Sequence, residues 1–137
     1  MSTTLNRTQI ATVTALTLLY GVASLVHFAH NAEFLMEYPN LPSWLTRAEV
    51  YVVWLGVTAL GVLGYVLLRA GRVVAGLLLL AAYAVLGLDG LLHYGRASVA
   101  AHTLTMNATI WFEVLAAAAL LVAVGVLAAR RLRPGAR

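Results

Sequence analysis

Residues 8–38 read TQIATVTALTLLYGVASLVHFAHNAEFLMEY, an apolar run that ends in two histidines and two carboxylates. The apolar part is long enough to cross a membrane as a helix, which takes about 20 residues. It is also longer than the apolar core of a signal peptide, roughly 7–15 residues, so we expect it to be retained. Ionisable side chains at the end of such a run either contact water or bind an ion or a molecule inside the protein. We favour the second.

The composition of the whole chain is that of a membrane protein. Of its 137 residues, 62% are hydrophobic and 10% are charged, whereas soluble domains average about 25% charged residues. All nine positive charges are arginines. They lie between and after the apolar runs and form no interleaved basic patch, so the sequence predicts no nucleic-acid partner. The absence of cysteine excludes a disulfide framework, a thiol nucleophile and a cysteine-ligated metal.

Four apolar runs predict an all-α membrane protein with a single domain over residues 1–137. We place its transmembrane helices near residues 8–30, 47–69, 72–94 and 99–131. Thr46 and Glu49 have the spacing of a capping box, which predicts the start of the second helix. Tyr38 and Trp44 are expected in the aromatic belt at the membrane surface. The short connections predict an up-down-up-down four-helix bundle embedded in the lipid bilayer.

The arginines are divided unevenly between the two ends of this bundle. Only Arg47 and Arg96 fall on one side, and the other side carries Arg7, Arg69, Arg72, Arg130, Arg131, Arg133 and Arg137. Cytoplasmic segments of membrane proteins carry an excess of positive charge. We therefore predict a protein of the cell (inner) membrane with both termini cytoplasmic. Loops 31–46 and 95–98 then face outward.

This topology places all four histidines and all five acids in the outer half of the protein. Five of them lie in one layer, about 20 helical residues or roughly 30 Å from the inner arginines: His27, Glu49, Asp89, His93 and Glu113. His30, Glu33 and His102 lie somewhat farther out. An ionisable side chain within a membrane helix costs about 2.5–3.5 kcal/mol. We therefore expect these side chains to turn inward and to meet in one cluster.

Imidazole and carboxylate groups from several helices are the ligands with which helical bundles bind metal ions. A divalent ion also compensates several buried charges at once. The predicted ligands are His27, His30, Asp89, His93 and His102, with Glu113 or Glu33 as a further ligand or as an acceptor for a ligand's N–H. Without a thiolate, the predicted cofactor is copper, iron or zinc. The predicted function is a membrane metalloprotein, in one form an oxidoreductase acting on a lipid-soluble or small substrate.

Asp89-x-x-x-His93 followed by His102 resembles the Asp-x-x-x-His…His copper site in the membrane C subunit of particulate methane and ammonia monooxygenases. The resemblance covers residues 89–102, and the gap before the second histidine is shorter here. It implies copper as the metal. The histidine boxes of membrane desaturases are matched only in part, because four histidines are too few for a full set.

The same residues leave other functions open. Intramembrane Asp–His and Glu–His pairs can instead stabilise helix packing, by about 0.6 kcal/mol a pair, or contact a partner subunit. They form proton or small-ligand pathways, and histidines bind b-type haem. Below the layer the helices are nearly all Ala, Leu, Val and Gly, which argues against a continuous channel. A homo-oligomer or a larger membrane complex is also open, since close helix packing is favoured by small residues, here Gly56, Gly61, Gly64, Gly87 and Gly90.

Overall fold

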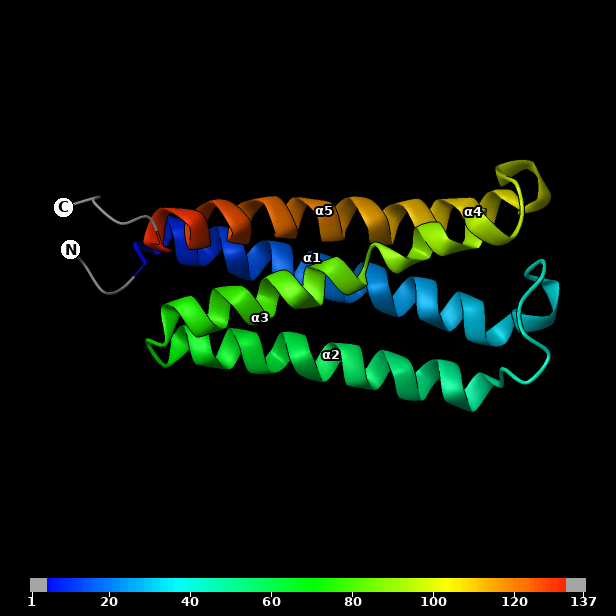
Figure 1. Cartoon of the computed structure of the whole chain (residues 1–137), viewed down its shortest axis with the longest axis horizontal. Helices are drawn as coiled ribbons and strands as arrows, with labels where there is room; N and C mark the ends of the chain where they lie inside the picture. Colours follow the sequence, from blue (N-terminus) through cyan, green and yellow to red (C-terminus); the bar gives the residue numbers. More distant parts are fainter. Residues whose placement is uncertain (1–4, 133–137) are drawn as a thin grey trace.

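The computed structural model describes residues 5–132, and these form an all-helical bundle (Figure 1). Four helical segments are long and apolar enough to cross a membrane: Arg7–Glu33, Arg47–Arg69, Val73–Arg96 and Leu104–Leu132. Large apolar side chains such as Leu18, Val52 and Val122 are exposed on their outer faces, as lipid contact requires. The protein is therefore a multi-pass membrane protein. Arg133 and Arg137 lie outside the described residues.

The first two helices begin with matched side-chain caps. At the start of α1 (Arg7–Glu33), the Asn6 side chain accepts from the Gln9 backbone N–H at 2.8 Å, and the Gln9 side chain accepts from the Asn6 N–H at 3.0 Å. At the start of α2 (Arg47–Arg69), Thr46 and Glu49 form the same reciprocal pair. The capping box predicted at Thr46 is confirmed, and it fixes the boundary of the second helix.

The third crossing is interrupted, where the sequence predicts one continuous helix. It consists of α3 (Val73–Leu86), a short 3-10 turn η2 (Asp89–Leu91) and α4 (Leu92–Arg96). Gly87 and Gly90 lie within the break, and glycine costs about 1 kcal/mol in a helix relative to alanine. In Figure 1, α3 lies beside α2, and both α3 and η2 also contact α5. After the break, Asp89 and His93 line a cavity together with Val50 and Val53 of α2 and His27 of α1.

The fourth crossing, α5 (Leu104–Leu132), begins later than residue 99. A loop with a 3-10 turn, η3 (Val99–Ala101), precedes it. The Asn107 side-chain amide donates to the backbone oxygens of Val99 (3.1 Å) and His102 (3.2 Å). The Thr103 hydroxyl accepts from the Met106 N–H at 3.2 Å. Because these bonds satisfy the loop backbone outside a helix, the helix starts after Thr103.

The two ends of the bundle differ in charge and in polarity. In Figure 1, α1 begins and α5 ends at one end, which therefore carries Arg7 and Arg130. At the opposite end lie the connection after α1, which contains the 3-10 turn η1 (Leu35–Glu37), and the loop between α4 and α5. The candidate site residues lie toward this second end.

Candidate functional site

Glu113, on α5, is the most deeply buried charged residue of the site. Its exposed fraction is 0%, and its polar neighbour on α1, the buried Ser24 hydroxyl, is too poorly placed to form a hydrogen bond with either carboxylate oxygen. His27 of α1 faces it, with Nε2 at 3.8 Å from Glu113 Oε2. This distance is too long for a hydrogen bond. Two ligands at 2.0–2.2 Å from one transition-metal ion, however, lie up to about 4.2 Å apart, so the separation fits an ion between the two atoms.

Two further imidazoles continue the cluster toward the outer loops. The ring centroid of His93 lies 5.4 Å from that of His27 and 6.1 Å from that of His102. His102 Nδ1 lies 2.9 Å from the Ser98 backbone oxygen, so Nδ1 carries the ring proton. His102 Nε2 then holds a lone pair, and it is buried without a partner among the described residues. A histidine that binds a metal ion is held in the same way, with its second ring nitrogen donating to a carbonyl.

The Asn31 side chain determines which ring nitrogen of His93 carries the proton. Its side-chain nitrogen Nδ2 lies 3.2 Å from His93 Nε2, and because an amide nitrogen only donates, Nε2 accepts and the ring proton is on Nδ1. His93 Nδ1 and Asn31 Oδ1 are both buried without a partner within residues 5–132. If the amide turns over, Oδ1 accepts from Nε2–H and Nδ1 becomes a free lone pair. His93 therefore has a second arrangement in which Nδ1, rather than Nε2, holds the free lone pair.

Tyr38 closes the cluster from the loop after α1. It is only 3% exposed, and its ring centroid lies 5.1 Å from that of His93. Its hydroxyl lies 2.9 Å from His30 Nδ1. Burial raises the pKa of Tyr38 to about 12, so the hydroxyl keeps its proton. The prediction that Tyr38 belongs to the aromatic belt is wrong, because its ring packs on the histidines; Trp44 is 70% exposed.

Three predicted ligands lie at the edge of this cluster or outside it. Glu33 is at the surface, where its oxygens accept from Arg47 (3.1 Å) and Tyr51 (2.9 Å). His30 is paired with Tyr38. Asp89 is exposed on η2 and lines a cavity of about 150 Å³ together with His27 and His93. The cluster proper contains His27, His93, His102 and Glu113.

Sequence analysis did not identify Tyr38 or Asn31 as parts of the site. Asn31 carries a readable signal, because it belongs to a polar stripe on α1 with spacings of three or four residues, made up of Thr14, Thr17, Tyr20, Ser24, His27 and Asn31. Residues at these spacings share one helix face. Tyr38 has no such periodicity, because it lies in a loop whose path the sequence does not determine.

Within residues 5–132, no group of three or more histidine, aspartate or glutamate side chains is arranged to hold a metal ion. His27 and Glu113 form a close pair, with Nε2 at 3.8 Å from Oε2. Comparisons with protein families, curated proteins and solved structures found no match. The function proposed below is therefore argued from the residues of the site alone.

Proposed function

We propose that the protein is a membrane metalloprotein that binds one transition-metal ion, copper, iron or zinc, between His27 and Glu113. The observation that carries the proposal is the Glu113 carboxylate, which is fully buried, has no hydrogen-bond partner among the described residues and lies 3.8 Å from an imidazole nitrogen. Burying an uncompensated charge costs several kcal/mol. A divalent ion removes this cost and uses both groups as ligands.

The third ligand in this proposal is His93. Its ring is the nearest other imidazole to His27, and turning the Asn31 amide frees the His93 Nδ1 lone pair. The ring must also move toward His27 to complete a three-ligand site, because no three such side chains in the described part of the chain already surround one point. His102, whose Nε2 already holds a lone pair, is a further ligand at the outer edge. Substrate access is through the cavity of about 150 Å³ beside His27 and Asp89. With copper or iron, the protein is an oxidoreductase for a small or lipid-soluble substrate.

Elemental analysis of the protein purified from its native membrane, combined with a visible absorption spectrum, tests the proposal. We expect about one ion of copper, iron or zinc per chain, and a lower thermal stability after treatment with a strong chelator, because bound metal stabilises the folded state. A wild-type protein without stoichiometric metal, equally stable with and without chelator, would contradict the metal site.

Proton transfer is a second candidate function, favoured by the polar stripe on α1. The stripe continues from the cluster toward the arginine-rich end, where the Thr14 hydroxyl lies 2.9 Å from the Tyr65 hydroxyl. Chains of histidine and carboxylate side chains inside membrane proteins are typical of proton relays, and the hydroxyls of this stripe would extend the His27–Glu113 pair. Proteoliposomes distinguish the candidates: metal-free protein that conducts protons, and stops doing so when Glu113 is replaced by glutamine, would favour this function over the metal site.

The orientation in the membrane is also part of the proposal. We propose an up-down-up-down bundle in the cell (inner) membrane with both termini cytoplasmic, so that the histidine cluster is near the outer face. Its support is the distribution of arginine, including Arg7 and Arg130 at the end where α1 begins and α5 ends.

Single cysteines report this orientation directly, because the chain has none of its own. We expect a Ser43→Cys variant in intact cells to react with a membrane-impermeant thiol reagent, since Ser43 lies in the outward loop. An Ala70→Cys variant, in the exposed turn after α2, is the control and should react only after the membrane is breached. The reverse pattern of labelling would invert the proposed orientation.

A further inference from the structure

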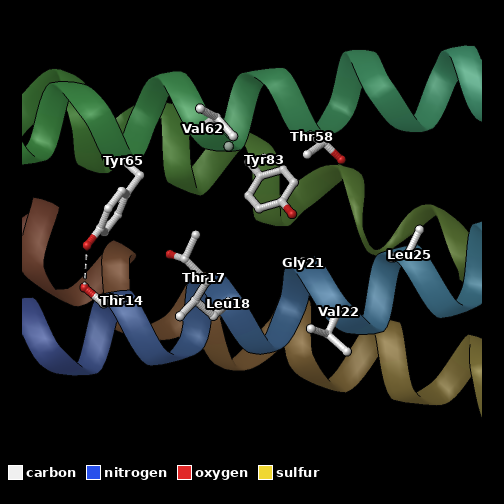
Figure 2. Close-up of a pocket in the computed structure, with 11 residues that line it drawn as sticks. Thr14, Thr17, Leu18, Gly21, Val22, Leu25, Thr58, Val62, Tyr65 and Tyr83 are labelled. Carbon is white, nitrogen blue, oxygen red and sulfur yellow. Dashed lines mark hydrogen bonds between the residues drawn. The ribbon is translucent and has the colours of Figure 1, made fainter.

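A second, larger pocket lies between α1 and α2 (Figure 2). Its volume is about 560 Å³, within the range of roughly 300–1,000 Å³ typical of small-molecule sites. Tyr83 of α3 forms its inner wall, opposite Gly21 of α1. It is separate from the small cavity beside His27, and the two share no lining residue.

The pocket opens toward the lipid at mid-membrane depth. Its residues Leu18, Val22 and Val62 are all more than half exposed. Thr17 and Thr58 lie near the middle of their transmembrane helices, Arg7–Glu33 and Arg47–Arg69. A molecule dissolved in the hydrocarbon layer can therefore reach the pocket sideways, without passing through water.

The lining contains polar oxygens that an empty or purely apolar pocket leaves without partners. The hydroxyl oxygens of Thr17 and Thr58 are buried and make no hydrogen bond within residues 5–132. The Tyr83 hydroxyl points toward α1 (Figure 2) and lies 3.8 Å from the position that a Cβ on Gly21 would occupy. Water is absent at this depth, so an unsatisfied hydroxyl can gain a partner only from the protein or from a ligand.

We propose that this pocket binds a neutral, lipid-soluble molecule that carries a carbonyl oxygen. The carbonyl accepts from the Tyr83 hydroxyl and, once the Thr58 side chain turns about its Cα–Cβ bond, from the buried Thr58 hydroxyl. The apolar body fills the space beside Leu18 and Val22. A plain acyl chain would leave these hydroxyls without partners. A helix of a second copy that covers the mouth of the pocket is the alternative occupant, and the oligomeric state tests it. This binding site is separate from the proposed metal centre and does not depend on it.

Filling the pocket tests the proposal. Gly21→Leu places a side chain in the pocket without a backbone clash, because its Cβ would meet only the Tyr83 hydroxyl, at 3.8 Å. Gly56→Leu is the matched control, since Gly56 is exposed on α2 and a Cβ there meets nothing within 4 Å. The probe is decylubiquinone, titrated into detergent-solubilised protein. We expect saturable binding that Gly21→Leu weakens at least about tenfold, as a filled pocket requires, and that Gly56→Leu leaves unchanged.

Removing single hydroxyl groups from the pocket distinguishes recognition of the ligand's carbonyl group from burial of its hydrocarbon chain. Tyr83→Phe and Thr58→Val each delete one hydroxyl and should weaken binding roughly two- to tenfold, the loss expected for one neutral hydrogen bond. Methyl undecyl ketone should bind or displace the quinone, and tetradecane should do neither. If only the quinone binds, the ligand is a quinone; if the ketone binds as well, the carbonyl group suffices.

Three results would overturn the proposal. The first is displacement by tetradecane as effectively as by the ketone, which would mean that the pocket takes any hydrocarbon chain. The second is wild-type affinity in Gly21→Leu, or no saturable binding of either carbonyl probe. The third is a change of oligomeric state in Gly21→Leu, which would assign the pocket to a second copy. Metal content measured on the same samples keeps this test independent, because neither glycine lies in the cluster.

Discussion

Replacement of Glu113 by glutamine is expected to abolish metal binding. The amide keeps the size of the side chain and one acceptor oxygen but removes the negative charge, and an uncharged amide is a poor ligand for copper, iron or zinc. His27 Nε2 then loses the only carboxylate within 4.0 Å among the described residues. We expect the metal content of purified protein to fall from about one ion per chain to below about a tenth. Elemental analysis measures the change.

Glu33→Gln is the matched control, because it makes the same chemical change outside the cluster. Glu33 is exposed, and its oxygens accept from Arg47 and Tyr51. An exposed ion pair of this kind contributes about 0–1 kcal/mol, so metal content and folding should stay as in the wild type. Full metal occupancy in Glu113→Gln, or an equal loss in both variants, would show that Glu113 is not a ligand.

The common depth of the ionisable residues was the most informative feature of the sequence. It depends only on helix rise and on the arginines at the helix ends. Three residues of that layer, His27, His93 and Glu113, lie together in the bundle, and His102 joins them from farther out. Burial cost explains why. A polar side chain that cannot reach water must find other polar groups, and those at the same depth are the nearest.

The rest of the site depends on backbone features that helical periodicity does not encode. The break after Leu86 shifts Asp89 to an exposed position, although an unbroken helix would place it on the same face as His93. Glu33 lies at the last residue of α1, close enough to α2 for Arg47 to reach it. Tyr38 enters the cluster through a loop. Each of these positions is set by tertiary contacts rather than by spacing along one helix.

The contacts of the glycines also depend on the tertiary structure and could be predicted only in part from the sequence. Gly64 was expected to allow close packing, and it does so against the Leu80 backbone, but the tightest contact in that region involves Gly76, which the sequence did not single out. A Cβ on Gly76 would lie 2.6 Å from the Leu68 backbone nitrogen and 2.9 Å from the Gly64 oxygen. The pairing of α2 with α3 therefore depends on two backbones in direct contact.

Gly76→Ala is accordingly expected to destabilise the protein strongly for the addition of one methyl group. The atoms that it would meet belong to the α2 backbone, which cannot turn aside as a side chain can, so α2 and α3 must separate and lose packing along their length. We expect a loss of roughly 1–3 kcal/mol in the free energy of unfolding, measured by titrating detergent-solubilised protein with SDS. Gly56→Ala, whose Cβ meets nothing within 4 Å, should stay within about 0.5 kcal/mol of the wild type. Equal stability of the two variants would mean that α2 and α3 are not in backbone contact in the membrane.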